Sequence, residues 1–430
     1  MEDELETTYF YDTCALLNVG GEAFKHPFIV SPVTLEELDH IKTSASKDEI
    51  TKELQRNVSR LLTQNKGKYQ VVSPTLYDDI NSIREEFHVQ ETNDNLIVAS
   101  VMYAIRTHMA DNIVFCTDDI NANLIASTVF DIPTVGSDAI LCELEDYTGY
   151  KDVDLTDDEL GELLSHPTEN TFGCLPNQYL VIHDPNNIEV VDALKWTGAE
   201  FVQLQSKQFD SYHINKDDLD VRTLDIYQKC ALDSMLTNQI TVMRGAAGTG
   251  KTWLGFSYLV WLLDTHQIEK IYVACNTVAS KDSAQLGFYP GTKDEKVLGT
   301  NIGGILSDNL GDRIELESMI QKEQIELLPM CDARGRSLSK GYYAVYMTEA
   351  ENMTVSLMQL LIQRLGENTK CILEGDNDQQ LDRYAYYGYN NGMRRASEVL
   401  RGSNLYGEVK LPIIHRSTIA GLAQKMTERG

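Results

Sequence analysis

The chain has 430 residues, of which 42% are hydrophobic, and its formal net charge is −28 at pH 7. This length predicts about two or three domains, and no apolar run approaches the roughly 20 residues of a membrane span. The acidity argues against nonspecific binding of duplex nucleic acid over a broad surface, because such binding needs a basic face. Any path for a nucleic acid must therefore be local.

The N-terminus and the cysteines favour a cytoplasmic protein. The chain opens with acidic residues and lacks a basic segment followed by an apolar one, so no secretory signal is expected. The eight cysteines form no CxxC pair, and Cys116, Cys275 and Cys371 lie in apolar runs. Reduced thiols in the protein core are expected.

Residues 1–142 alternate short apolar runs with longer amphipathic segments. This alternation predicts an α/β domain with a parallel sheet, whose strand C-termini collect functional residues. The expected strands and helices cover, respectively, residues 10–11, 28–30, 71–72 and 113–116, and residues 49–63, 75–87 and 94–108.

Acidic residues follow these strands, and they are Asp12, Glu37, Asp94, Asp118 and Asp119. Carboxylates gathered in one pocket repel one another unless a cation neutralises them, which favours a site for Mg²⁺ or Mn²⁺. Such a site could hydrolyse a phosphodiester. Spacing alone also allows ordinary helix caps and turn acids, because Asn93-Asp94 and Asp118-Asp119 stand where N-caps would stand.

Residues 8 to about 140 resemble a PIN domain, a metal-dependent ribonuclease fold. The resemblance rests on Tyr11-Asp12-Thr13, Glu37 to Lys42, Asn93 to Ile97, and Thr117 to Ile120, in that order. It implies that Asp12, Glu37, Asp94 and Asp119 are the metal ligands. Asp118 stands where the family often has Asn.

Residues 143–219 are expected to form an acidic linker and a small β-rich connector. Acidic residues are concentrated over 143–162, where Lys151 is the only basic residue, so this stretch is interpreted as a solvated linker or domain edge. Short β-like segments follow over 179–182 and 201–204. The role of the connector is not indicated by its sequence.

Residues 220–430 alternate strands and helices again, around a phosphate-binding loop. The loop consists of Gly245, Ala246, Ala247, Gly248, Thr249, Gly250, Lys251 and Thr252. Its glycines let backbone N–H groups converge on a polyphosphate, Lys251 reaches the terminal phosphates, and the Thr252 hydroxyl is placed to bind Mg²⁺. The alternative is a Gly-rich turn that precedes Lys-Thr by chance. The expected strands cover 240–243, 271–275, 343–347, 370–374 and 408–411.

Further polar residues flank this loop in the sequence. Gln228 could recognise an adenine edge with its amide, or it could be a surface glutamine of a helix. Glu349 follows the strand 343–347 and would polarise water. After the strand 370–374, Asp376 could help to hold the metal and Gln379 could sense the γ-phosphate.

Residues 220–425 resemble the PhoH-like ATPases, a helicase-related group with a RecA-like P-loop fold. The segments that carry the resemblance are 228–232, 245–252, 286–291, 334–338, 348–352, 375–379 and 415–417. A PIN domain fused to such an ATPase implies ATP-dependent RNA unwinding and ribonuclease activity. Arg416 matches a position from which an arginine reaches the phosphate of a neighbouring subunit, which implies a ring, expected to be hexameric.

Two positions depart from the family pattern. The family usually has Asp-Glu-Ala-Gln-Asn where this chain has Thr348 to Asn352, and a basic residue with Pro where it has Cys275-Asn276. Because a threonine supplies no charge to hold a metal-bound water, weak Mg²⁺ binding and slow hydrolysis of ATP are expected.

Local basic groups are expected to guide single-stranded RNA. Lys52, Arg56 and Arg60 share one face of a helix, and Arg334 and Arg336 flank a glycine. Three tyrosines are available to stack on bases, namely Tyr384, Tyr386 and Tyr387. The alternative for these groups is a solvated helix face and ordinary surface tyrosines.

The sequence thus favours an ATP-dependent RNA-processing protein with a metal-dependent ribonuclease and an ATPase or RNA helicase. ATP and Mg²⁺, with Mn²⁺ possible in the nuclease, are the expected cofactors, and RNA and further copies of the chain are the expected partners. Two alternatives remain open. One is a regulatory RNA-binding scaffold that binds ATP but hydrolyses little of it, and the other is a noncatalytic hub for protein interactions.

Overall fold

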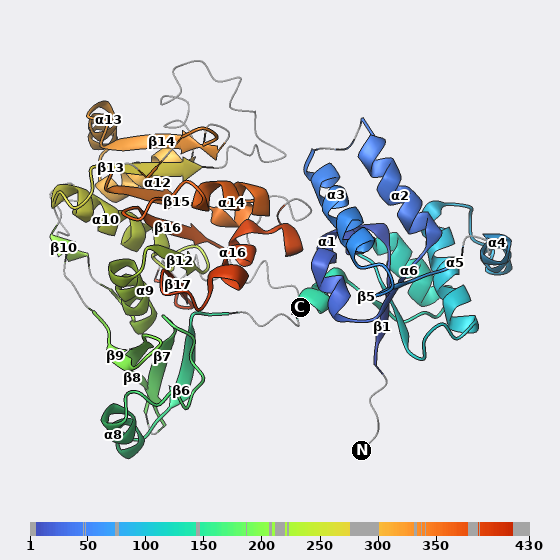
Figure 1. Ribbon diagram of the computed structural model, residues 1–430, viewed down its shortest axis with the longest axis horizontal. Helices are drawn as coiled ribbons and strands as arrows, with labels where there is room; N and C mark the ends of the chain where they lie inside the picture. Colours follow the sequence, from blue (N-terminus) through green and yellow to red (C-terminus); the bar gives the residue numbers. More distant parts are fainter. Residues whose placement is uncertain are drawn as a thin grey trace. The chain divides into compact units, whose positions relative to one another are not determined.

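The computed structural model describes residues 6–45, 47, 49–73, 77–142, 147–185, 187–205, 209–210, 220–221, 223–275, 301–330, 333–336, 338–339, 341–376, 386 and 388–415. Contacts divide these residues into two compact units. The first contains residues 6–142, 386 and 388–390, and the second contains residues 147–376 and 391–415. Each unit is built on its own parallel sheet (Figure 1).

The first unit is a five-stranded parallel sheet covered by helices on both faces. The strand order is β3-β2-β1-β4-β5. The strands are β1 (Thr8–Tyr11), β2 (Phe28–Val30), β3 (Gln70–Val71), β4 (Ile113–Cys116) and β5 (Thr134–Val135). The α-helices are α1 (Thr13–Val19), α2 (Pro32–Thr43), α3 (Glu49–Gln64), α4 (Tyr77–Glu86), α5 (Asn93–Arg106), α6 (Ile120–Thr128) and α7 (Ser137–Cys142), and 3₁₀ turns η1 (Gly20–Lys25) and η6 (Gly388–Asn390) join them.

Neighbouring residues of β1 point to opposite faces of this sheet, which gives the unit two cores. Phe10 packs on one face with residues of α4, α5 and α6, and Tyr11 packs on the other with residues of α1, α2 and α3. The helix α2 was not predicted from the sequence. It begins at Pro32, and the Ser31 hydroxyl accepts a hydrogen bond of 2.9 Å from the Thr34 N–H, which caps the first turn.

The connector forms a mixed sheet of order β6-β7-β8-β9. Its strands are β6 (Tyr150–Asp154), β7 (Tyr179–Asp184), β8 (Asn187–Trp196) and β9 (Phe201–Gln203), and the helix α8 (Asp157–Ser165) follows β6. The acidic stretch that was interpreted as a linker therefore contains a strand and a helix. Its acids fit this structure, because Asp157, Asp158 and Glu159 occupy the first turn of α8, where a negative charge is stabilised by the helix dipole.

The main sheet of the second unit has six parallel strands in the order β14-β13-β15-β16-β12-β17. They are β12 (Ile240–Arg244), β13 (Lys270–Cys275), β14 (Ile325–Pro329), β15 (Tyr343–Met347), β16 (Lys370–Gly375) and β17 (Tyr406–Lys410), and a short antiparallel pair is formed by β10 (Phe209–Asp210) and β11 (Asp220–Val221). The strand β12 is buried throughout, as expected for the interior of a parallel sheet. These sheets confirm the predicted α/β fold class.

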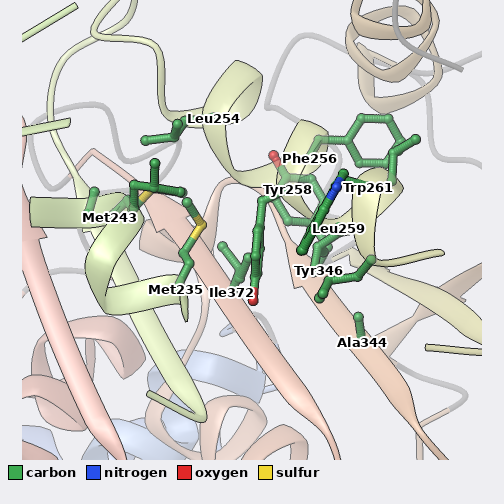
Figure 2. Packing of buried hydrophobic residues seen from close by; sticks show 14 of the residues in the cluster. Met235, Met243, Leu254, Phe256, Tyr258, Leu259, Trp261, Ala344, Tyr346 and Ile372 are labelled. Carbon is green, nitrogen blue, oxygen red and sulfur yellow. The ribbon is translucent and has the colours of Figure 1, made fainter. Parts of the chain in front are cut away.

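The helices of this unit are α9 (Ile226–Thr237), α10 (Lys251–Asp264), α12 (Asn301–Leu310), α13 (Arg313–Gln321), α14 (Val355–Ile362) and α16 (Gly392–Leu400), with the 3₁₀ turn η5 (Ala350–Asn352). The helix α10 is apolar over most of its surface, because it lies in the core rather than at its edge. Figure 2 shows its side chains, including Phe256 and Tyr258, gathered beside Tyr346 of β15 and Ile372 of β16.

The mixed sheet is joined to the helix α9 by a buried polar group. Lys195 of β8 lies 3.3 Å from the Asp233 carboxylate, and their side chains are only 5% and 2% exposed. The Tyr179 hydroxyl donates to the same carboxylate at 2.7 Å, and the Gln205 N–H donates to it at 2.8 Å. The connector therefore shares a core and a hydrogen-bond network with the phosphate-loop fold.

Among the described residues, no helix has the length and hydrophobicity needed to span a bilayer. Cys116 and Cys371 are free thiols and are buried, as the sequence indicated. The side chain of Cys275 lies outside the described part of the chain.

We predict that Asp233→Asn strongly destabilises the second unit. The amide keeps the shape but leaves the buried Lys195 ammonium without a counter-charge, so the free energy of unfolding should fall by about 3–5 kcal/mol. Tryptophan fluorescence during urea denaturation measures this unit specifically, because the three tryptophans, Trp196, Trp253 and Trp261, all belong to it.

Glu317→Gln is the matched control for this variant. It makes the same chemical change in the exposed pair between Arg313 and Glu317, and it should shift the free energy of unfolding by no more than about 1 kcal/mol. Equal shifts for the two variants would contradict the structural role of Asp233.

Candidate active sites

Asp12 is held at the end of β1 by hydrogen bonds that fix its carboxylate. Its Oδ1 accepts from the Ala15 N–H at 2.6 Å, so Asp12 is the N-cap of α1. Its Oδ2 accepts from the Thr117 hydroxyl, which follows β4. Burial raises the pKa of Asp12 to about 7, although these two hydrogen bonds act in the opposite direction. The site therefore disfavours a negative charge in the absence of a cation.

Glu37 of α2 connects the starts of two other helices. Its Oε2 accepts from the Thr13 hydroxyl at 2.5 Å, and its Oε1 accepts from the Asn93 amide at 2.9 Å. These contacts bring the first turn of α5 next to α1 and α2. Asp94 in that turn is exposed. Its pKa is raised, mainly by partial desolvation and to a smaller extent by the negative charges of Glu37 and Asp119.

Asp119 is also exposed, and it is the N-cap of α6. Its Oδ1 accepts from the N–H groups of Asn121 and Ala122 at 2.8 and 2.9 Å. The cap expected at Asn93-Asp94 is instead Thr92, which caps α5. Asp118 has a different environment from Asp119, because its oxygens accept from the Asn18 amide at 2.7 Å and the Ser137 N–H at 2.8 Å. Its position is therefore fixed by the surrounding protein.

The four acids proposed as ligands lie within electrostatic range of one another around Asp12 and Glu37. In the described part of the chain, none of them forms an ion pair with a lysine or arginine. Oxygens without a hydrogen-bond partner among these residues belong to Asp94 and to Oδ2 of Asp119. Four carboxylates without a basic partner are a donor set that suits Mg²⁺ or Mn²⁺.

These side chains do not form a complete metal cage as they stand. Within the described residues, no three acidic, histidine or cysteine side chains are close enough together to hold an ion. Coordination therefore requires movement of side chains, which the exposed Asp94 and Asp119 can make. The assignment of the ligands stays a prediction.

The phosphate-binding loop connects β12 to α10, and two of its glycines have backbone conformations that a side chain would disturb. Gly245 has φ of 151°, and a Cβ there would lie 2.5 Å from the Leu411 carbonyl oxygen. Gly250 has φ of 87°, and a Cβ there would lie 2.7 Å from Nε2 of Gln228. The spacing of the motif is therefore imposed by the packing of the loop.

Lys251 folds back onto this loop. Its ammonium donates to the carbonyl oxygens of Gly245 and Ala246 at 2.6 and 2.9 Å. Burial lowers the pKa of Lys251, whereas the charges of Glu374, Asp376 and Glu351 raise it. A phosphate that entered the loop could replace the carbonyl oxygens as the acceptor of these hydrogen bonds.

Gln228 is buried rather than on the surface, with 4% of its area exposed. Its Nε2 donates to the Thr249 carbonyl at 3.0 Å, and its Oε1 accepts from the Leu224 N–H at 2.7 Å. The amide therefore connects the start of α9 to the phosphate loop. Recognition of adenine by Gln228 stays a prediction, and it would have to use the second amide hydrogen or exchange one of these bonds.

Two acids of the segment after β15 have distinct environments. Glu349 is exposed and has φ of 53° and ψ of 41°, a left-handed conformation that is uncommon for a residue with a side chain. Glu351 is 5% exposed, and its Oε2 accepts from the Asp376 N–H at 3.2 Å. Burial raises the pKa of Glu351 to about 8. A protonated Glu351 has nearly the shape of the glutamine that the family pattern has there.

The end of β16 carries an acid that sequence reasoning missed. Glu374 is 4% exposed, and its Oε1 accepts from the Thr252 hydroxyl at 2.7 Å. Burial raises the pKa of Glu374 to about 7, while Thr252, Lys251 and the nearby Tyr346 hydroxyl lower it. The donor set at Thr252, a hydroxyl and a buried carboxylate, suits Mg²⁺. In the sequence, the signal that could have identified Glu374 was its position at the end of the predicted strand 370–374.

A second missed contact joins the C-terminal segment to the loop. The His415 N–H donates to the Gly248 carbonyl at 2.9 Å, and its imidazole lies 2.5 Å from the Asp225 carboxylate. Gln379 and Arg416 lie outside the described residues, as do Tyr384 and Tyr387. Tyr386 is 2% exposed, so the expectation that it stacks on a base is wrong. Arg336 pairs with Glu326, whereas Arg56 and Arg60 are exposed on α3.

Comparisons with known proteins match both parts of the chain. Residues 9–136 match the family model of the PIN domain, and residues 220–424 match that of the PhoH-like protein. Protein PhoH2 of Bacillus subtilis is 27% identical over 454 residues, which cover 96% of this chain and 98% of that protein. A PhoH-like protein of Mycobacterium tuberculosis is 32% identical over 42% of this chain and 49% of its own length.

Among solved structures, the Pif1 helicase from Candida albicans aligns with 48% of this chain and 43% of its own, at 13% identity and a TM-score of 0.26. The two family matches cover successive parts of the chain, and the alignment with PhoH2 of Bacillus subtilis extends over 96% of it. The chain is therefore a PIN domain fused to a PhoH-like domain.

Proposed function

We propose that this chain is an RNA-processing enzyme in which a metal-dependent ribonuclease acts together with an ATPase that unwinds or feeds RNA. The observation that carries the proposal is that one chain has two candidate sites at strand ends, each in its own compact unit. One site has four carboxylates without a basic partner among the described residues, and at the other the glycine-rich loop with Lys251 joins β12 to α10.

The proposed nuclease site combines two acids that are held by hydrogen bonds with two acids that are exposed. Asp12 is fixed by Ala15 and Thr117, and Glu37 is fixed by Thr13 and Asn93. Asp94 and Asp119 face solvent and provide oxygens that a bound ion can recruit. Mg²⁺ or Mn²⁺, when bound, activates water and stabilises the leaving oxygen of the phosphodiester.

In the ATPase, Lys251 and the backbone of residues 245–252 bind the phosphates, and Thr252 contributes its hydroxyl to the site of Mg²⁺. Glu349 would orient the attacking water. It lies two residues after β15 in a left-handed backbone conformation, and its side chain is exposed. Asp376, Gln379 and Arg416 complete the proposed constellation, the last from a neighbouring subunit of a hexameric ring. RNA, in single-stranded form, is the proposed substrate.

We predict that Asp119→Asn abolishes cleavage of labelled single-stranded RNA. Asparagine caps a helix about as well as aspartate, so the fold is retained while one ligand charge is lost. Loss of a residue that only supports a metal ligand typically lowers activity by up to about 100-fold. Loss of a ligand itself should lower the cleavage rate in Mg²⁺ or Mn²⁺ by at least that factor. Gel analysis of the RNA products measures this rate.

The control for this variant is Asp111→Asn, which makes the same change at an exposed residue before β4, at the opposite edge of the same sheet. It should cleave RNA like the unmodified protein. Full activity of Asp119→Asn would contradict the nuclease assignment.

We also predict that Lys251→Ala loses hydrolysis of ATP, because the ammonium that neutralises the terminal phosphates is removed. Release of inorganic phosphate measures the effect. Lys322→Ala, which removes an exposed lysine after α13, should hydrolyse ATP at the normal rate. Negligible hydrolysis by the unmodified protein, with ATP and RNA still bound, would instead select the regulatory scaffold.

A further inference from the structure

We propose, on the basis of the ATPase function proposed above, that Glu374 supplies the carboxylate of the Mg²⁺–nucleotide site that Thr348 lacks. The acid of this site would thus be carried by β16 rather than by β15. Three observations support this relocation: the environment of Thr348, the bond between Glu374 and Thr252, and the order of the strands.

Thr348 lies directly after β15 and cannot replace a carboxylate. Its side chain has no charge, and the residue is 3% exposed. Its hydroxyl is buried and has no hydrogen-bond partner among the described residues. A buried hydroxyl without a partner costs free energy, so this position is not adapted to a structural hydrogen bond.

Glu374 makes the contact that the missing acid would be expected to make. Its Oε1 accepts the hydroxyl of Thr252, the loop residue placed to bind the metal, at 2.7 Å. By distance and angle its buried Oε2 accepts no hydrogen bond within the described part of the chain, although the Tyr346 hydroxyl, which also has no such partner there, lies nearby. One oxygen therefore orients Thr252, and the other is available to a metal ion or a metal-bound water.

The strand order explains how an acid at position 374 can replace an acid at position 348. The strand β16 lies between β15 and β12, and Met347 pairs with Leu373 in parallel register. Thr348 follows Met347 and Glu374 follows Leu373, so the two residues come next after a register pair of adjacent strands, whose spacing is about 4.8 Å. Because Glu374 also pairs with Met243 of β12, it is one strand nearer to the phosphate loop.

Two other acids near the loop are less suited to this role. The Oε2 of Glu351 already accepts from the Asp376 N–H at 3.2 Å, and Asp376 itself lies just beyond the end of β16, whereas Glu374 lies within the strand. Neither forms a hydrogen bond with Thr252 in the described structure. We therefore assign Glu374 to the metal site by its bond to Thr252. On this proposal Mg²⁺ is held despite Thr348, which differs from the expectation drawn from the sequence.

The test measures how much Mg²⁺ tightens the binding of a fluorescent ADP analogue, by titration in Mg²⁺ and in EDTA. This ratio of dissociation constants concerns the nucleotide site alone, whereas direct titration of the metal would also detect the nuclease site. Glu374→Gln should reduce the ratio by at least about tenfold, as expected when a group that orients a metal ligand is lost. Its affinity for the analogue in EDTA should not fall, because a negative charge near the phosphates is removed.

The double variant Thr348→Asp/Glu374→Thr moves the carboxylate back across one strand, and it should recover most of the effect of Mg²⁺. The single variant Glu374→Thr should not recover it. This pair also keeps the proposal open to refutation if Glu374→Gln fails to fold. Glu367→Gln, at an exposed residue before the other end of β16, is the matched control and should leave the ratio unchanged.

An unchanged ratio in Glu374→Gln or Glu374→Thr would overturn the proposal, as would failure of the double variant to recover the effect. These outcomes differ from failure of the proposed function. If the unmodified protein bound no nucleotide in either condition, the ATPase assignment would itself be wrong, and the role of Glu374 would fall with it.

Discussion

The constraint on which both candidate sites depend is the parallel sheet, since all its strands end at the same edge. Side chains that follow the strands are therefore brought together from distant parts of the sequence. In the first unit this edge collects Asp12 after β1 and Asp119 after β4. In the second it collects the phosphate loop after β12 and Glu374 at the end of β16. The chemistry is thus a consequence of strand order.

Gathering acids at such an edge costs free energy, and burial increases this cost, while hydrogen bonds from neighbouring residues offset part of it. The pKa values of Asp12, Glu351 and Glu374 are raised chiefly by burial, which indicates that the surrounding protein does not by itself stabilise their charges. A divalent cation would supply the missing compensation at the sites of Asp12 and Glu374. The two units therefore offer the same arrangement for the proposed cleavage of RNA and for the proposed binding of a nucleotide.

Features encoded by local sequence were predictable, and features that depend on strand order were not. The strand Phe28–Val30 and the loop from Gly245 are found from a short apolar run and from glycine spacing. The acidic stretch was interpreted as a linker because acidic residues dominate its composition. The strand β6, which begins with the buried Tyr150, could not be recognised among them. The proposed role of Glu374 could not be inferred from the sequence, because local patterns do not place β16 between β15 and β12.

The proposed function combines cleavage of RNA with hydrolysis of ATP in one chain. The most direct measurement follows a labelled RNA that has a single-stranded tail and a duplex, incubated with the unmodified protein in Mg²⁺ or Mn²⁺, with ATP or with a nonhydrolysable analogue. We expect cleavage of the tail without ATP, cleavage within the duplex only when ATP is hydrolysed, and neither in EDTA. Intact RNA under every condition, or cleavage that persists in EDTA, would contradict the account.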